Sequence, residues 1–226
     1  MALSVATNTG ALMAQASASS VNKEMETSMA RLSSGKRINS AADDAAGVAI
    51  ASRLTSEIKG TNQAIKNAMD AQSLIDTAEG AHSEIESILQ RMRELAVQAS
   101  NDTNSGQDRV NLNTEFSNLS TEIDRISDIT AWAGDTLLDG SASTTSLTFH
   151  IGSNNNTDDS ISVTISNMAP SAIGSASSTQ VSALSVSVQA SAASAIAVLD
   201  AAIQEVNTQR ATLGSISNRL DHTVNS

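Results

Sequence analysis

Three long stretches of this chain repeat an apolar residue every three or four positions, and that period constrains the fold more than any other feature of the sequence. The stretches cover about residues 58–99, 112–130 and 199–223. This spacing is typical of α-helices that bury one apolar stripe against a neighbouring helix, and we call each stripe a seam. The seam residues that we expect to be buried are Ile58, Ile65, Ile85, Leu89, Met92, Leu112, Phe116, Ile123, Leu199, Val206, Leu213 and Leu220. Since no helix can bury its own stripe, the sequence predicts a mainly α fold, an elongated antiparallel helical bundle with coiled-coil-like seams.

The composition agrees with long, thinly packed helices. Pro170 is the only proline, so no proline interrupts a helix between residues 44 and 100. Only Phe116, Trp132 and Phe149 are aromatic. A core normally draws much of its buried area from aromatic rings. This chain must therefore fill its seams with Leu, Ile, Val, Met and Ala.

The segment between the second and third seams follows a different period. Apolar and polar residues alternate there along two short runs, whose apolar members are Leu147, Phe149 and Ile151, then Ile161, Val163 and Ile165. Residues 152–159, which separate the runs, are rich in Asn and Asp. Period-two alternation around such a turn predicts a small β-hairpin. Ser171–Ser194, in which nine of the 24 residues are serine, is interpreted either as a flexible linker or as the frayed start of the last helix.

The N-terminal part of the chain is only weakly amphipathic. Its first twenty residues carry too little apolar area to stay ordered alone. Gly35 has the position of a helix C-cap in the left-handed region. Ser40 and Asp43 match a capping box, which predicts that a new helix begins there.

The ionisable residues exclude several classes of function. The formal net charge of −11 leaves no basic field to bind nucleic acid. The chain has no cysteine, which excludes disulfides and thiolate metal ligands. His82, His150 and His222 do not have the spacing of a metal-binding pair, and His82 falls on the first seam as an interior or seam-edge residue. No apolar stretch is long enough to span a bilayer, so we expect no membrane insertion.

Catalytic motifs are absent as well. Glu84 and Glu86 stand two positions apart, and such residues do not face each other on a helix. Serine is abundant, but neither a nucleophile motif nor a glycine-rich phosphate loop occurs. The first twenty residues contain no Lys or Arg and no continuous apolar run, unlike a Sec-type signal peptide. The sequence therefore predicts no enzyme, no cofactor and no metal, and favours a protein that assembles through its helices.

Two segments carry a family pattern. Arg31–Leu54 reads RLSSGKRINSAADDAAGVAIASRL, and Leu89–Gln98 reads LQRMRELAVQ. Shorter stretches that agree with the same pattern are Glu122–Ile126, Leu137–Gly140, Leu213–Ser215 and Asn218–Arg219. The chain resembles bacterial flagellin, the subunit of the flagellar filament, over nearly all of residues 1–165 and again from about residue 195.

The resemblance implies a layout, a location and a set of partners. Flagellins pair the helices of their two chain ends along the filament core, with a helical bundle and a β-hairpin outside it, and are exported unfolded through the flagellar type III apparatus. The implied partners are other flagellin subunits, the export apparatus, and junction and cap proteins, and the implied location is extracellular, in the flagellum. The resemblance implies four parts: residues 1–39 as a filament-core and export segment that is disordered in the monomer, 40–140 as the N-terminal part of the bundle, 141–183 as the hairpin with a reduced variable region, and 184–226 as a truncated returning helix.

The chain departs from the family pattern at three places. Its middle is minimal, because residues 141–194 leave no room for large outer domains. The family pattern implies a further C-terminal core helix beyond Ser226. Residues 131–134 read AWAG where the family has a Phe-Asn-Gly type of segment, so we expect a different local turn. Two alternatives stay open: a hook–filament junction protein, and a flagellin-like cell-surface binding protein or adhesin.

The resemblance also implies a surface for the vertebrate flagellin-sensing Toll-like receptor. In the family this surface is centred on an Arg and a Leu of the first long bundle helix and a Glu of the next. The matching positions are Arg91, Leu95 and Glu115. Arg91 and Leu95 are four residues apart and so share a helix face. We expect this face to be open in the monomer, with Leu95 as an apolar plug beside Arg91.

Overall fold

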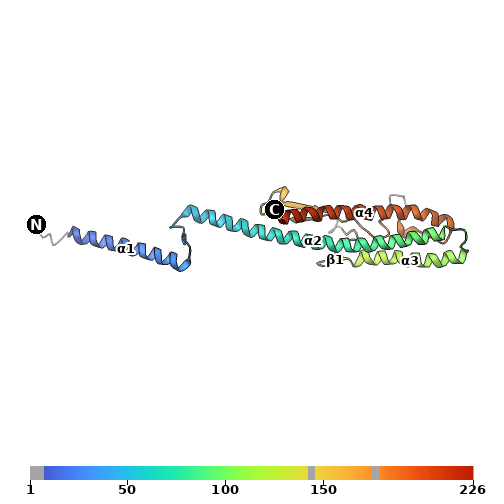
Figure 1. Cartoon of the computed structure of the whole chain (residues 1–226), viewed down its shortest axis with the longest axis horizontal. Helices are drawn as coiled ribbons and strands as arrows, with labels where there is room; N and C mark the ends of the chain where they lie inside the picture. The colour runs from blue at the N-terminus through green and yellow to red at the C-terminus, as the bar shows by residue number, and fades with distance from the viewer. Residues whose placement is uncertain (1–7, 142–145, 175–178, 226) are drawn as a thin grey trace. The chain divides into compact units, whose positions relative to one another are not determined.

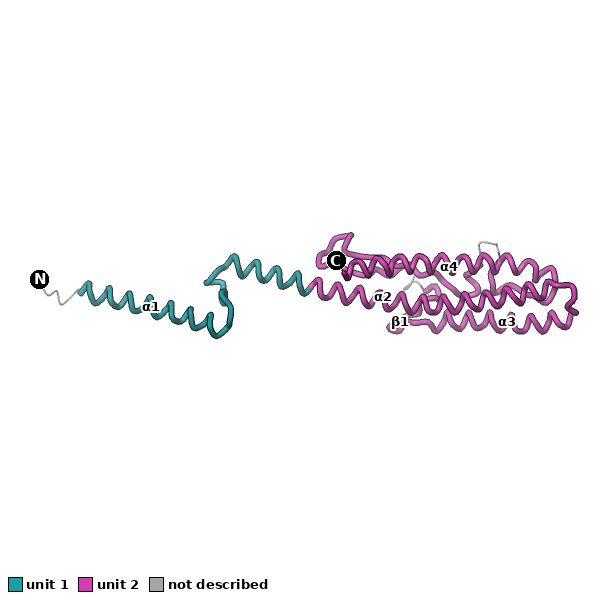
Figure 2. Tube along the Cα trace, viewed as in Figure 1, with its two compact units in different colours: residues 1–59 teal, residues 60–226 magenta. Residues whose placement is uncertain are grey.

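The computed structural model describes residues 8–141, 146–174 and 179–225, and its elements are drawn in Figure 1. The chain divides into two compact units, Met1–Lys59 and Gly60–Ser226 (Figure 2). Each unit is described by itself below. In the described part of the chain, no helix combines the length and the apolarity that a membrane span requires.

The first unit contains α1 (Thr9–Ser34) and the beginning of α2 (Ala45–Ala99). Asn8 caps α1 by accepting a hydrogen bond from the backbone N–H of Ala11 at 3.2 Å. Gly35 ends the helix with φ 67° and donates its N–H to the Arg31 carbonyl at 2.9 Å, as predicted. Residues 9–34, which belong to the segment expected to be disordered in the monomer, form this helix, and none of them is buried. Residues 1–7 lie outside the described part.

A tight turn precedes α2. The Asp43 carboxylate accepts the backbone N–H groups of Asn39 and Ser40, at 3.1 and 2.9 Å, and these bonds hold the pKa of Asp43 below its usual value. The predicted pairing of Ser40 with Asp43 is therefore present, but it closes this turn and does not cap α2, which begins at Ala45. Asp44 caps α2, because its carboxylate accepts a hydrogen bond from the backbone N–H of Gly47, in the first turn, at 2.8 Å.

The second unit is an antiparallel bundle of α2, α3 (Gly106–Ile129) and α4 (Gln189–Asn225), which lie side by side in Figure 1. Ser105 and Asp108 form a capping box at the start of α3. Arg93 on α2 pairs with Asp200 near the start of α4, whereas Gln72 near the middle of α2 bonds Asp221 near the end of α4. These two contacts show that α4 runs opposite to α2.

The core of the second unit follows the predicted seams. Nine of the twelve predicted residues are buried: Ile85, Leu89, Met92, Phe116, Ile123, Leu199, Val206, Leu213 and Leu220. Ile65 and Leu112 are partly buried. Ile58 is wrongly predicted, since it is 60% exposed. The buried stretch of α2 begins only at Ala64, and no described residue of the first unit is buried, so nothing there covers Ile58.

The predicted hairpin is present. Strand β3 (Leu147–His150) pairs antiparallel with β4 (Ser160–Val163), with Leu147 opposite Val163 and Phe149 opposite Ile161. A short 3-10 turn, η1 (Thr157–Asp159), leads into β4. A second, smaller hairpin, β1 (Ala131–Trp132) with β2 (Asp135–Thr136), was not predicted.

The described residues of the serine-rich segment after β4 pack against the bundle up to residue 188, and only its last six residues form the start of α4. Three of its apolar side chains ahead of α4, Ile173, Val181 and Val186, are buried, as are Ile165 and Met168 just before it. It contains a 3-10 turn, η3 (Val181–Ala183), and α4 begins only at Gln189, five residues later than the expected boundary. Hydrogen bonds connect this region to the helices of the bundle: Gln209 on α4 donates to the Thr164 carbonyl just before the segment, and Asn113 on α3 accepts from the Val186 N–H within it.

Candidate functional site

Arg91 on α2 joins two carboxylates on the surface of the bundle. Its Nη1 lies 2.9 Å from Glu94 Oε2 on the same helix, and its Nη2 lies 2.8 Å from Glu115 Oε1 on α3. The Arg91 and Glu115 side chains are 49% and 46% exposed. The hydrogen bonds to Glu115 and then Glu94 raise the pKa of the Arg91 guanidinium. The structure thus brings together two of the three residues that the resemblance singled out.

Leu95, the third of these residues, is not on that surface. It is 1% exposed and belongs to the core, so the expectation of an open apolar plug beside Arg91 is wrong. At this level α2 is flanked on one side by α3, through Glu115, and on the other by α4, through Asp200. Two neighbours widen the buried face of a helix beyond one seam.

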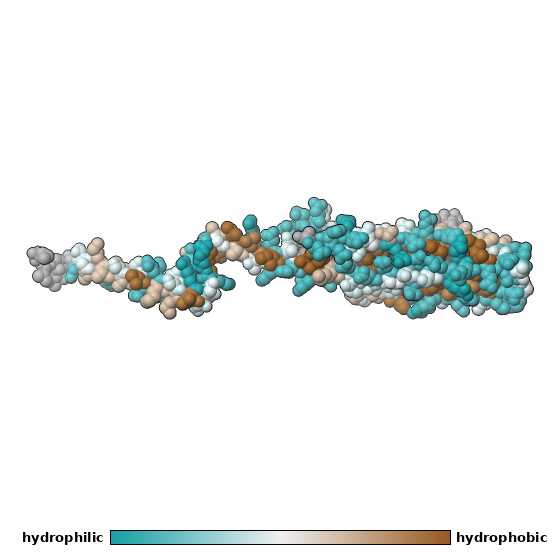
Figure 3. Space-filling view, in the orientation of Figure 1, coloured by the Kyte–Doolittle hydropathy of each residue, from teal (hydrophilic) through white to brown (hydrophobic). Residues whose placement is uncertain are grey.

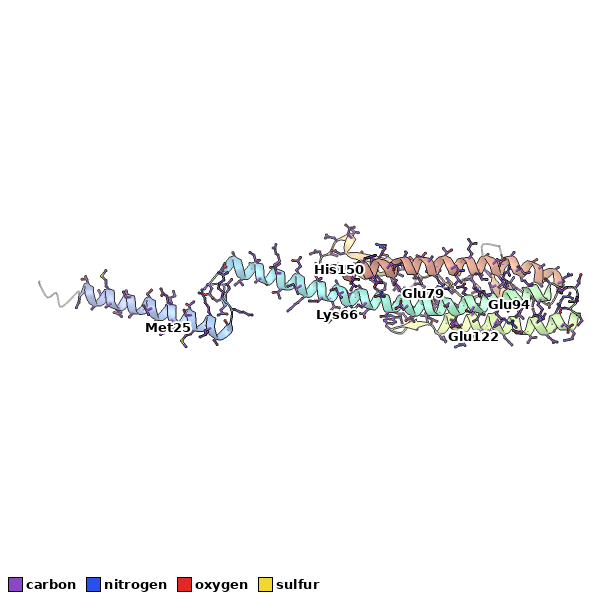
Figure 4. The ribbon with its side chains drawn as sticks, viewed as in Figure 1. Met25, Lys66, Glu79, Glu94, Glu122 and His150 are labelled. Atoms are coloured by element: carbon purple, nitrogen blue, oxygen red, sulfur yellow. The ribbon has the colours of Figure 1, made fainter. Side chains whose placement is uncertain are left out.

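Glu94 takes the exposed place beside Arg91, and sequence reasoning missed it. The signal that could have found it is its spacing, because residues three apart are neighbours on a helix surface. Its side chain is 69% exposed, and Figure 4 labels it on the bundle. Three half-exposed or exposed charged groups, Arg91, Glu94 and Glu115, therefore form one ion-paired cluster that a partner protein can contact.

The first unit presents a second surface, which is apolar. Nine of the fourteen large hydrophobic side chains that the structure shows exposed lie between Leu12 and Ile58. Brown patches mark such residues on the space-filling view (Figure 3). A surface helix of a monomeric protein scatters its exposed apolar residues, whereas a contiguous stripe marks an interaction site.

These residues are arranged in two stripes. On α1 the stripe consists of Val21, Met25, Met29 and Leu32, and Figure 4 labels Met25. At about 100° per residue these four positions fall within one face of the helix. On α2 the corresponding stripe is Ile50, Leu54 and Ile58, spaced four residues apart. Exposure in the two stripes ranges from 47% at Leu54 to 86% at Leu32.

The polar groups of the described residues offer little for chemistry. They hold no group of three or more His, Asp or Glu placed to bind a metal ion. His150 and His222 are exposed on separate elements, whereas His82 is fully buried inside the bundle. What the geometry provides is surface for protein contacts: a charged cluster on the bundle and apolar stripes on the first unit.

Comparison with known proteins accounts for this arrangement. The model of the bacterial flagellin N-terminal helical region matches residues 5–143, and that of the C-terminal helical region matches residues 196–226. The chain belongs to the bacterial flagellin family. The flagellin of Halalkalibacterium halodurans is 44% identical over 199 residues, which are 88% of this chain and 70% of that protein. The flagellar filament 33 kDa core protein of Treponema phagedenis is 38% identical over 225 aligned positions, and the match covers 96% of this chain and 78% of that protein.

The solved structures agree with this flagellin assignment. The crystal structure of Bacillus cereus flagellin superimposes with a TM-score of 0.61 at 33% sequence identity, covering 71% of this chain and 88% of that one. The resemblance read from Arg31–Leu54 and Leu89–Gln98 is therefore confirmed, as is the mainly α fold with a small hairpin. Flagellins are structural proteins, which fits a chain whose candidate sites are contact surfaces.

Proposed function

We propose that this chain is a subunit of the bacterial flagellar filament that assembles with further copies of itself through the exposed apolar stripes of its first unit. The observation that carries the proposal is that α1 is a helix of 26 residues without one buried side chain. Ordering a residue costs about 1–2 kcal/mol of backbone entropy. Burying a large aliphatic side chain gains about 1.5–3 kcal/mol. A partner that covers the stripes supplies this burial.

The sequence composition fits a partner of the same kind. The stripes contain no charged residue, and the same apolar side chains are present on every copy. Assembly of identical subunits in a filament is heterologous, so the stripe of one copy packs against a different face of the next. The proposal also includes export of the chain through the flagellar apparatus and a role in motility, as in the rest of the family.

The proposal is tested by expressing the gene in a flagellated bacterium that lacks its own flagellin and viewing the cells by electron microscopy. Met25→Glu combined with Met29→Glu charges the α1 stripe and should abolish filaments. Ala16→Glu combined with Ser20→Glu is the matched control, because it adds the same charge to exposed positions on the opposite face of α1. Filaments from the stripe variant, or none from the parent, would contradict the proposal.

The same images separate the rival functions. A hook–filament junction protein would leave cells with a short cap of subunits and no long filament. A flagellin-like surface-binding protein would coat the cell without any filament. Long filaments that contain the parent chain favour the filament subunit over both.

A second proposal concerns recognition of the monomer by the vertebrate flagellin-sensing Toll-like receptor. The exposed, ion-paired cluster of Arg91, Glu94 and Glu115 supports it, and Leu95 supports the helix from within the core. Arginine is a frequent interface hot spot, so Arg91→Ala should weaken binding of the receptor ectodomain by about 1–3 kcal/mol. Arg125→Ala is the control, because Arg125 is an exposed arginine of α3 whose ion pair among the described residues is with Glu122 of its own helix. Equal affinities of the parent and Arg91→Ala would refute this proposal.

A further inference from the structure

His82 is an ionisable residue in the middle of an apolar seam. It is fully buried, and the residues seven positions before and after it, Ile75 and Leu89, are fully buried too. In a coiled-coil-like repeat, positions seven apart make equivalent contacts with the neighbouring helices. His82 therefore occupies a place that the rest of the seam gives to aliphatic side chains.

The hydrogen bonds of His82 define one neutral form of its ring. Nδ1 lies 2.5 Å from the Ala78 carbonyl oxygen, which can only accept, so Nδ1 carries the proton. Nε2 is buried and has no hydrogen-bond partner among the described residues. A second proton on Nε2 would place an N–H and a full positive charge where nothing described accepts them. Burying an unpaired polar group is costly, and an unpaired charge more so.

The acidic side chains nearest to His82 are already paired with another cation. Arg210 reaches from α4 and pairs with Glu79 at 3.6 Å and with Glu86, both on α2. These two carboxylates are therefore already engaged by a cation. Burial lowers the pKa of His82 and the positive charge of Arg210 lowers it further, whereas the bond to Ala78 and the charge of Glu79 act in the opposite direction.

Among the described residues of the other elements, no acidic side chain is buried at this level. On α3, the pairing of Arg91 with Glu115 and the antiparallel direction place His82 level with residues 124–126. The buried residues of α3 there are Ile123 and Ser127, whereas Asp124 and Arg125 are exposed. The segment from Ser160 to Val188 contains no ionisable side chain at all. On α4, the acidic residue that precedes Arg210 is Glu205, and its carboxylate accepts a hydrogen bond from the Gly174 N–H.

We propose that His82 is an acid-sensitive switch of the second unit, in which protonation of the imidazole Nε2 loosens the packing between α2 and α4. Proton linkage gives the direction in which stability changes with pH, because the unfolded chain binds this proton more readily than the folded bundle does. The bundle therefore keeps its full stability above about pH 6.5, the unperturbed value for histidine, and loses stability as the pH falls below it. The inference concerns the second unit alone and does not rest on filament assembly.

The test is urea unfolding of the full chain, followed by circular dichroism, between about pH 7.5 and pH 5, where most carboxylates stay ionised. For the parent, the equilibrium constant of unfolding should rise by up to about tenfold per pH unit below pH 6.5, the limit for one proton. His82→Leu restores the aliphatic pattern of Ile75 and Leu89 and should abolish that rise. His150→Gln and His222→Gln, which remove exposed histidines, should retain it.

Two outcomes would overturn the proposal. One is a His82→Leu variant whose unfolding still depends on pH as in the parent, and the other is a loss of the dependence in either exposed-histidine control. Should His82→Leu not fold, the titration of the His82 ring in the parent, followed by NMR, decides the matter. A midpoint at or above about 6.5 would show that the folded bundle accepts the proton without penalty.

Discussion

Replacing Ala133 with asparagine should stabilise the bundle. Ala133 has φ 53° and is the one non-glycine residue with positive φ in the described part of the chain. It and Gly134, φ 98°, are the two central residues of the β1–β2 hairpin, in which Trp132 pairs with Asp135. Positive φ at both positions defines a type I′ turn, for which Asn-Gly is the favoured pair. Alanine therefore carries a strain at this turn that asparagine would relieve.

The size of the gain can be worked out from the local geometry. An L-residue in the left-handed region is strained by about 1–2 kcal/mol. Asparagine is several-fold enriched there, which corresponds to roughly 1 kcal/mol of relief. Position 133 is exposed, so the longer side chain meets no core atom. Ala133→Gly relieves the strain as well, but glycine frees the unfolded chain at a cost of about 0.5–1 kcal/mol, so it should remain close to the parent.

Thermal unfolding followed by far-ultraviolet circular dichroism measures this difference. A gain of 1 kcal/mol raises Tm by about 2–4 °C for a unit of this size. Ala131→Asn is the matched control: Ala131 is exposed in β1, where asparagine is unfavourable, so its Tm should not rise. A Tm of Ala133→Asn that equals or falls below the parent's would refute the reasoning, as would an equal rise in Ala131→Asn.

Three further substitutions test the packing and the caps. Ile123→Ala, at a fully buried seam position, should cost about 2–5 kcal/mol in urea unfolding, whereas Ile129→Ala, 60% exposed on the same helix, should stay within about 0.5 kcal/mol. Gly140→Ala should lower Tm more than Gly134→Ala, because both have positive φ but only the Gly140 methyl would meet a side chain, Asn167, at 2.5 Å. The hydroxyl and N–H of Ser105 lower the pKa of the Asp108 carboxyl. The stability that this carboxylate contributes is therefore present above about pH 4 and is lost as the pH falls through the lowered pKa. In urea unfolding measured over a series of pH values, Asp108→Asn should reduce this dependence of the unfolding free energy on pH.

The seams could be predicted from the sequence because their signal is a period. Ile85, Leu89 and Met92 repeat at three and four, and a helix turns such a repeat into one buried face. The period alone does not say where the partner helix stops. Ile58 continues the pattern of the first seam, yet the burial of α2 begins at Ala64. The apolar repeat also does not tell how many helices pack against α2 at a given level. For that reason Leu95 is expected at the surface from the sequence, whereas α3 and α4 together bury it.

Irregular segments carry no comparable signal. Among the described residues from Thr164 to Val188, several backbone groups form hydrogen bonds with side chains of distant helices, such as those of Gln209 and Asn113. Their partners lie 45 and 73 residues away in sequence, so local propensity does not reveal them. The charged cluster was found only because the family resemblance pointed to Arg91 and Glu115, and Glu94 became apparent through its contact distance.

The absence of buried residues between Asn8 and Lys59 has a consequence for hydrogen exchange. Amide protons exchange with solvent through local opening, and opening is easy where no side-chain packing is lost. The amides of α1 and of the first turns of α2 should exchange quickly in the isolated chain, while those of α2 beyond Ala64 exchange on the timescale of unfolding of the bundle. A deuteration profile would then change sharply inside one continuous helix, at a place that its backbone hydrogen bonds do not mark.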